Sequence, residues 1–314
     1  MCRFICDACY RGLNCNNGYA FAVYYEDRVI GIVMNHVLSD GIGYNCFVRS
    51  LLDIYFGEPA THVLDPGAAD YDFDPLAKEW ELSMDTVREP SVCGSFVRNS
   101  DTDTSSTEDM FAIKISRAEF RSLCCKFNAS VQTMLTFLAM QALRRRYPKG
   151  EAFSLRIPLN ARKLLGVPGT FHNTSLANIR VQATNAQIGA RDGLVALIRE
   201  QIAAQNTRDF AVRELNLYRK LLLAESDAEF YKLIDLLLGN DVMVVSYLGS
   251  SIAGDSYASH ILDIHTRPCL FPLTLYAFSV GDRLCISGYD ANGHGAYRRS
   301  LREALEELSL KEVP

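Results

Sequence analysis

Residues 29–41 have the sequence VIGIVMNHVLSDG, in which an apolar run ends at a short polar turn. An almost continuous apolar run is typical of a strand that is buried on both faces. Glu26-Asp27-Arg28 separates this run from an apolar and aromatic run at 19–25, so the two runs predict a hairpin. After Gly41, apolar residues recur at helical spacing as far as Tyr55. The stretch therefore predicts a strand, a tight turn and a helix.

The turn carries two side chains suited to proton transfer. His36 lies just beyond the predicted strand, where α/β folds often present functional groups. Imidazole titrates near neutral pH, so it can remove a proton from an alcohol, amine or thiol as a bond forms. Asp40 could fold back across the turn or pair with an arginine elsewhere, and Gly41 permits a tight turn. The structural alternative is a buried histidine satisfied by the backbone, with Asp40 as the N-cap of the helix.

The remainder of the chain mixes strands and helices, which predicts an α/β or α+β fold. Strands are expected at 110–115, 153–157, 175–181 and 241–246, and as a hairpin at 272–280 and 283–289. Helices are expected from a capping box at 116–119 onward and at 131–147, 192–206, 213–238 and 297–310. The chain length suits two lobes, and residues 58–109 are irregular and polar. We therefore expect one lobe at 1–109 and a second at 110–314.

Charge and hydropathy exclude several classes of function. The formal net charge of −5 argues against a nucleic-acid partner, because nucleic-acid binders carry a basic field. The basic cluster at 144–146 ends a predicted helix, where cations suit the helix dipole. No apolar run approaches the ~18–20 residues of a membrane span, and the N-terminus lacks the apolar stretch of a signal peptide. We expect a cytoplasmic protein without a membrane span.

Cysteines crowd the N-terminus, at Cys2, Cys6, Cys9 and Cys15. The spacing of Cys6 and Cys9 is that of a zinc knuckle, but no second Cys or His pair follows at a matching interval. A reducing cytosol disfavours disulfides. We therefore expect free thiols and no metal site.

The sequence HVLSDG at 36–41 resembles the HxxxDG motif of the coenzyme-A-dependent acyltransferase superfamily, which includes chloramphenicol acetyltransferase and the condensation domains of nonribosomal peptide synthetases. Later segments are similar to segments of that superfamily in the same order, namely ASVQTML at 129–135, IPLNAR at 157–162, FHN at 171–173 and VSYLG at 245–249. The resemblance implies a two-lobed fold of the chloramphenicol-acetyltransferase type, with a tunnel between the lobes. Because only 35 residues precede His36, we expect the N-terminal lobe to be incomplete.

The resemblance implies a role for each residue that matches the motif. His36 would be the general base that acts on the acceptor. Asp40 would be structural and paired with an arginine, for which Arg162 is the candidate. Gly41 would leave space for substrate in the tunnel.

The resemblance also makes Ser246 and Asn173 candidates for contacting the substrate or its oxyanion. Tyr247 stands where the superfamily usually has asparagine. Asn35 stands where chloramphenicol acetyltransferase and condensation domains often have a second histidine, which favours the alcohol acetyltransferase branch.

The predicted function is transfer of an acyl group from a coenzyme A thioester to a small alcohol or amine, with His36 as the base. Acyl-coenzyme A would be a co-substrate, with no bound cofactor and no metal. One alternative is a condensation-like domain that uses thioesters tethered to a carrier protein. Another is a non-catalytic, truncated relative that only binds a ligand or partner.

Overall fold

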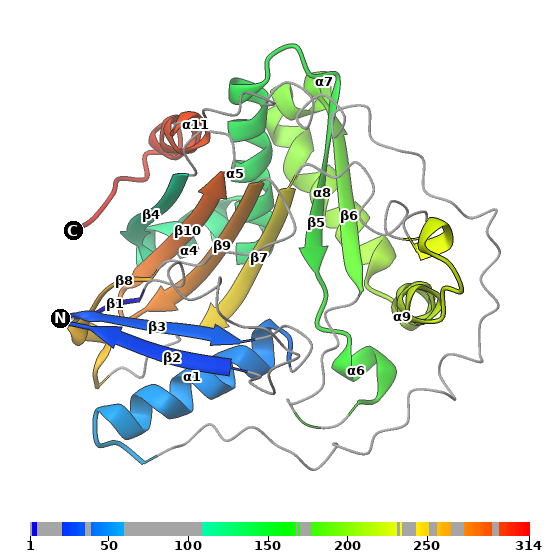
Figure 1. Ribbon diagram of the computed structural model, residues 1–314. Coiled ribbons are helices and arrows are strands. Elements are labelled where there is room, and N and C mark those ends of the chain that lie inside the picture. The colour runs from blue at the N-terminus through cyan, green and yellow to red at the C-terminus, as the bar shows by residue number, and fades with distance from the viewer. Residues whose placement is uncertain are drawn as a thin grey trace.

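The computed structural model describes residues 2–4, 21–34, 39–59, 109–167, 169, 177–230, 233, 243–250, 256–264, 273–290 and 295–314. Its strands form two sheets, and helices cover them (Figure 1). The expected mixture of strands and helices in an α/β fold is confirmed. None of the helices described is long and apolar enough to cross a membrane.

The smaller sheet has four strands, in the order β2 (Phe21–Glu26), β3 (Val29–Met34), β1 (Cys2–Phe4) and β8 (Ile261–Ile264). The predicted hairpin is present, because β2 and β3 pair antiparallel around a turn in which Asp27 has a φ of 47°. The four central residues of β3 are buried, as its apolar sequence predicts. Helix α1 (Gly41–Tyr55) follows this strand along the chain. Strand β8 pairs in parallel with β1, so the C-terminal half of the chain contributes to this sheet as well.

The larger sheet has six strands, in the order β4 (Asp109–Ser116), β10 (Arg283–Asp290), β9 (Leu273–Val280), β7 (Met243–Ser250), β5 (Ala152–Pro158) and β6 (Asn178–Thr184). The predicted hairpin of β9 and β10 is confirmed. Strands β5 and β7 run parallel and pair at two positions, Leu155 with Met243 and Arg156 with Val244. Beyond these positions the two strands separate, so their carboxyl ends lie apart at the same edge of the sheet (Figure 1).

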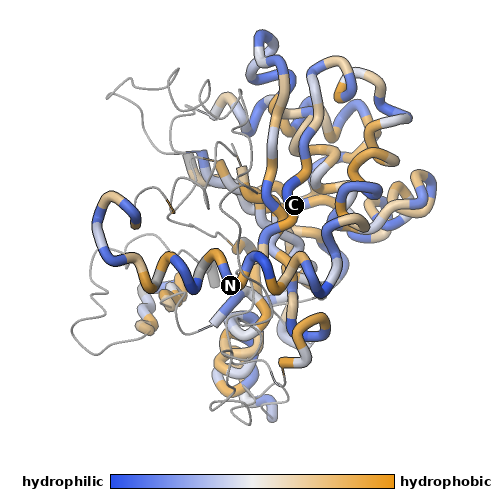
Figure 2. Tube along the Cα trace, turned by 90° about the vertical axis from the view of Figure 1, so that its right-hand side faces the viewer, coloured by the Kyte–Doolittle hydropathy of each residue, from blue (hydrophilic) through white to orange (hydrophobic). Residues whose placement is uncertain are grey.

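Helices pack on the larger sheet and on one another. They are α4 (Arg117–Lys126), α5 (Val131–Arg146), α6 (Arg162–Leu165), α7 (Asn185–Gly189), α8 (Arg191–Gln205), α9 (Arg208–Leu222) and α11 (Ala296–Glu306). Helix α5 is central, because every residue from Thr133 to Leu143 is buried and it contacts β7, α8 and α11. Hydrophobic and hydrophilic residues alternate along the outer helices, as expected when one face covers a core (Figure 2).

Two hydrophobic cores hold the elements together. The larger core lies between the six-stranded sheet and α5, α8 and α11. The smaller core joins β3, α1 and β8 to residues of the larger sheet, including Phe278 and Cys285. Close packing is shown by Gly288 in β10, where an added Cβ would lie 2.1 Å from the ring of Phe111. The two sheets therefore share buried surface, and α1 contributes side chains to that shared core.

Several of the predicted element boundaries are wrong. The strand expected to end at 246 continues to Ser250, and the helix expected at 297–310 ends at Glu306. Strand β6 continues to Thr184, whose side chain forms a capping box with Gln187 and starts α7, a helix that the sequence patterns did not indicate. The single helix expected at 213–238 is also wrong. Helix α9 starts at Arg208 because Thr207 accepts a hydrogen bond from the Phe210 N–H, and it ends at Leu222.

Candidate active site

A buried ion pair joins the first turn of α1 to the segment that follows β5. Arg162 donates from Nη1 to Asp40 Oδ2 at 2.7 Å and from Nη2 to Asp40 Oδ1 at 2.9 Å. Asp40 is 2 % exposed and Arg162 is 6 % exposed. The Arg162 Nη1 also lies 3.3 Å from Asn160 Oδ1. The arginine expected to pair with Asp40 therefore does so, in the two-pronged geometry that gives the strongest carboxylate contact.

Asp40 is at the same time the N-cap of α1. Its Oδ1 accepts hydrogen bonds from the N–H groups of Ile42 at 3.1 Å and Gly43 at 3.2 Å. A carboxylate at this position satisfies orphan backbone donors and suits the positive end of the helix dipole. The two alternatives for Asp40, helix cap and arginine partner, are thus both realised in one side chain. Its position fixes where α1 begins and how that end lies relative to β5.

The first turns of α1 also pack on the end of β7. Asn45 Nδ2 donates to the Leu248 carbonyl oxygen at 2.8 Å. An added Cβ at Gly41 would lie 2.9 Å from Leu248 Cδ2, so glycine permits this close approach. Further along α1, Asp53 accepts a 2.5 Å hydrogen bond from Tyr257. The helix is therefore held to the larger sheet near its start and to the β8 region near its end.

Gln132 of α5 clamps β7 on either side of Ser246. Its Nε2 donates to the Val245 carbonyl oxygen at 3.1 Å, and its Oε1 accepts from the Tyr247 N–H at 2.7 Å. These backbone groups lie just beyond the positions where β7 pairs with β5, so the amide replaces a strand partner. Ser246 itself is 6 % exposed. The clamp fixes the backbone that carries this serine.

Two buried polar atoms beside the N-terminal end of α1 lack a hydrogen-bond partner in the part of the chain that the structure describes. They are Ser39 Oγ and Asn45 Oδ1. Buried polar atoms in native proteins nearly always have a partner, which can be protein, water or ligand. Both atoms lie near Asp40 and can form further hydrogen bonds at the N-terminal end of α1.

The structure brings together Asp40, Gly41 and Arg162, and α1 links them to the β7 segment that contains Ser246. His36 and Asn173 lie outside the described residues, so their predicted roles stay predictions. Gln132 was not singled out from the sequence. Its bonds go to backbone atoms more than a hundred residues away, and such bonds leave no residue pattern.

The arrangement resembles other α/β sites, because its polar groups lie at the carboxyl ends of parallel strands. It offers a serine hydroxyl on a braced strand and a rigidly placed helix start directly after the sequence that contains His36. Within the described residues, no group of three or more His, Cys, Asp or Glu side chains could hold a metal ion.

No protein-family profile and no curated protein sequence matches this chain, whereas solved structures match its fold. TRI101 from F. graminearum, complexed with coenzyme A and deoxynivalenol, has a TM-score of 0.59 at 13 % identity over 94 % of this chain and 70 % of that chain. The PapA2 acyl transferase has a TM-score of 0.53 at 13 % identity over 92 % of this chain and 68 % of that chain. The epimerization domain from the third module of tyrocidine synthetase B has a TM-score of 0.51 at 12 % identity over 92 % of this chain and 70 % of that chain. These similarities confirm the expected fold, which this chain shares with acyltransferases and peptide-synthetase domains.

Proposed function

We propose that this chain is an acyltransferase that moves an acyl group from a coenzyme A thioester to an alcohol or amine, with alcohols as the preferred acceptors. The buried Asp40–Arg162 pair carries the proposal, because it sits where the HxxxDG motif meets the end of a strand in the larger sheet. Fold neighbours add support. One is named an acyl transferase, and another was solved with coenzyme A bound.

His36 is the proposed general base. Its imidazole would take the proton of the acceptor hydroxyl or amine while the acceptor oxygen or nitrogen attacks the thioester carbonyl carbon. The carbonyl π electrons would move to oxygen, which gives a tetrahedral oxyanion. Collapse of this oxyanion would expel the coenzyme A thiolate, which takes the proton from the imidazolium. The acyl group thus passes directly from sulfur to acceptor, without an acyl-enzyme.

Ser246 is the proposed donor to the oxyanion. Its backbone is braced by Gln132, so the hydroxyl would be held in place before the charge develops. Loss of one such donor typically lowers kcat by about 10²–10³. Gln132 would act as a positioning residue, since its hydrogen bonds go to the backbone beside Ser246.

The experiment measures thiol release from acetyl-, hexanoyl- and palmitoyl-coenzyme A in the presence of a pool of alcohols and amines. Wild type is compared with His36→Ala, and circular dichroism establishes that both are folded. We expect acceptor-dependent release in wild type and a loss of about 10²–10⁴ in the variant. The matched control is His260→Ala, since His260 is exposed and stacks on Phe56. This control should keep full activity.

Three results would contradict the proposal in different ways. Equal turnover by wild type and His36→Ala would exclude His36 as the base. Turnover of acyl groups tethered to a carrier protein, without turnover of acyl-coenzyme A, would show that the donor is a carrier-protein thioester and would favour a condensation-like domain. Binding of coenzyme A or an acceptor by a folded wild type that turns over neither donor would favour a non-catalytic relative.

A further inference from the structure

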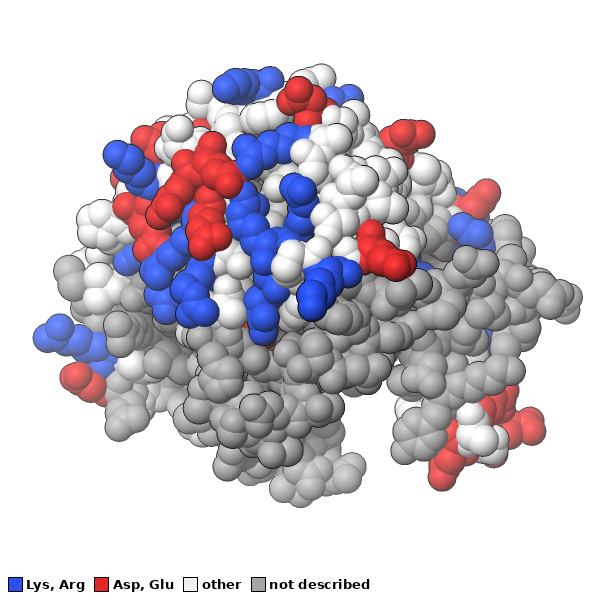
Figure 3. Space-filling view, turned by 90° about the horizontal axis from the view of Figure 1, so that it is seen from above, with Lys and Arg blue, Asp and Glu red and all other residues white. Residues whose placement is uncertain are grey.

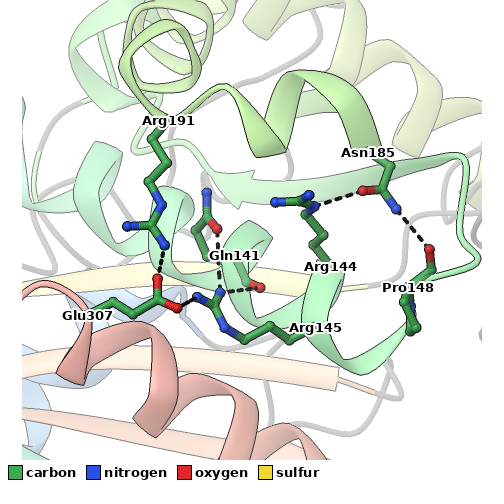
Figure 4. Close-up of a pocket in the computed structure, with 7 residues that line it drawn as sticks. All are labelled: Gln141, Arg144, Arg145, Pro148, Asn185, Arg191 and Glu307. Carbon is green, nitrogen blue, oxygen red and sulfur yellow. Dashed lines mark hydrogen bonds and ion pairs between the residues drawn. The ribbon is translucent and has the colours of Figure 1, made fainter.

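A pocket lies at the opposite end of α5 from the candidate active site. It has a volume of about 370 Å³ and lies between the C-terminal end of α5, the starts of α7 and α8, and the end of α11 (Figure 4). Gln132 and Arg144 are twelve residues apart on α5, so the two regions are separated by about 18 Å along the helix axis. The pocket is therefore separate from the site of the proposed acyl transfer.

The lining of this pocket is basic. Three arginines, Arg144, Arg145 and Arg191, and one carboxylate, that of Glu307, line it, which gives the lining a formal charge of +2. Arg145 Nε also lies 3.9 Å from Glu303 Oε2, just outside the lining, which lowers the local charge to +1. Glu307 forms ion pairs with both Arg145 and Arg191. Lys and Arg side chains gather beside an acidic group on the face of the molecule seen from above (Figure 3).

Arg144 is held in place without a countercharge. Its Nε donates to Asn185 Oδ1 at 2.8 Å, and no carboxylate among the described residues pairs with it. Asn185 is fixed in turn, because its Nδ2 donates to the carbonyl oxygens of Pro148 at 3.2 Å and Gly150 at 2.9 Å. The guanidinium also lies close to Gly189, where an added Cβ would be 3.1 Å from Arg144 Cζ. This arginine is thus an oriented cation with donor groups to spare.

Glu307 occupies an electrostatically unfavourable position in its own helix. It is the C-cap of α11, where the helix dipole disfavours an anion, and the last turn of α11 contains no basic residue. The arginines of α5 and α8 offset this cost. An incoming anion of higher charge could compete with Glu307 for the same arginines.

We propose that this pocket binds a phosphorylated small molecule through Arg144, Arg145 and Arg191, with Glu307 as a competing internal anion. A tetrahedral phosphate offers three acceptor oxygens, which matches three guanidinium groups from two helices better than the two oxygens of a carboxylate do. The volume equals that of about a dozen water molecules, so the ligand would carry an organic part beyond the phosphate. The size of the pocket lies in the range of small-molecule sites.

The test is titration of the full-length chain with inorganic phosphate and pyrophosphate by calorimetry, with sodium chloride at matched ionic strength as the reference. Wild type should bind pyrophosphate more tightly than phosphate. Arg144→Gln and Arg191→Gln should each weaken binding about tenfold or more, since each removes a charge-assisted contact. Glu307→Gln should tighten binding several-fold, because it frees Arg191 and leaves Arg145 only its longer contact with Glu303. Arg121→Gln on α4 is the control, since Arg121 is exposed and far from the lining in sequence.

Two variants that leave the charge unchanged test whether binding depends on the geometry of the pocket or only on its positive charge. Gly189→Ala places a Cβ 3.1 Å from Arg144 Cζ, so the guanidinium must shift slightly and pyrophosphate binding should weaken modestly, whereas Gly193→Ala has nothing within 4 Å and should not weaken it. Circular dichroism establishes that each variant is folded. Absence of saturable binding in wild type would overturn the proposal. So would equal affinity of all variants, or weaker binding in Glu307→Gln, because the arginines would then serve only to dock α11.

Discussion

Removing one charge from the Asp40–Arg162 pair should destabilise the protein far more than the same change at its surface. Asp40→Asn keeps an oxygen that can cap α1 but loses the negative charge, and Arg162→Gln loses the positive charge. Each change leaves the other charge buried, since Asp40 is 2 % and Arg162 is 6 % exposed. Breaking a buried pair in this way costs about 3–5 kcal/mol. That is a large part of the roughly 5–15 kcal/mol by which a folded domain is stable.

The assay is urea unfolding followed by circular dichroism for wild type, the two single variants and the double variant. The double variant should be more stable than additivity predicts by about 2–3 kcal/mol, within the range found for residues in direct contact. The control is Arg302→Gln in the Arg302–Glu312 pair, which also has two contacts, at 2.5 and 3.1 Å, but is exposed by 38 % and 41 %. An exposed pair is worth about 0–1 kcal/mol.

The reasoning is refuted if the coupling between Asp40 and Arg162 is below about 0.5 kcal/mol. It is equally refuted if the exposed pair proves as costly to break as the buried one. Asp40→Ala provides an internal check, because it removes the helix cap as well. It should be less stable than Asp40→Asn by about a further 1 kcal/mol.

Other substitutions test the packing and the titration of single residues. Gly41→Ala brings a Cβ to 2.9 Å from Leu248 Cδ2, the end of a side chain that can shift, so thermal unfolding should show a small loss of about 1 kcal/mol that Leu248→Ala relieves. Gly288→Ala places a Cβ 2.1 Å from an aromatic ring and should destabilise more, whereas Gly193→Ala in α8 meets no atom and should stabilise by about 0.5–1 kcal/mol. Burial raises the pKa of the Cys124 thiol to about 11, with a smaller contribution from its neighbouring cysteine. Because the folded thiol holds its proton more tightly than the unfolded one, the free energy of unfolding should fall as pH rises from about 9 to about 11. The urea midpoint should fall less between about pH 8 and about pH 10.5 in Cys124→Ala than in wild type. An equal fall in both proteins would contradict the raised pKa of Cys124.

Local patterns in the sequence predicted the elements that depend on local physics. The hairpins β2–β3 and β9–β10 and the start of α4 follow from apolar runs, turn residues and a capping side chain. The bounds of helix α9 were predicted poorly. The helical spacing of apolar residues continues past residue 222, but the helix ends there. Ser226 accepts from the Glu229 N–H and starts a new turn there. Capping residues decided the boundary where periodicity could not.

Tertiary pairings were predictable only where a motif indicated them. The pairing of Asp40 with Arg162 was expected from the resemblance, although the two residues are 122 positions apart. The charges at 144–146 were attributed to a helix end, which is correct for α5. Their partners Arg191 and Glu307 come from other elements, and no local spacing connects them. The parallel pairing of β8 with β1 likewise joins residues 2–4 to residues 261–264 without a local signal.

The candidate active site depends on contacts between residues that are far apart in the sequence. Besides the ion pair, Asn45 reaches Leu248 across 203 positions and Gln132 reaches Tyr247 across 115. Neither sheet can supply these groups alone, so the site should exist only when both sheets are packed together. A ligand bound there should consequently stabilise the whole molecule against unfolding rather than one lobe. At a concentration of one hundred times its Kd, the donor thioester would add about 2.7 kcal/mol to the free energy of unfolding. We expect a single unfolding transition whose midpoint rises when the ligand is added. Two separate transitions, of which only one shifts with the ligand, would contradict the claim that the site needs both sheets.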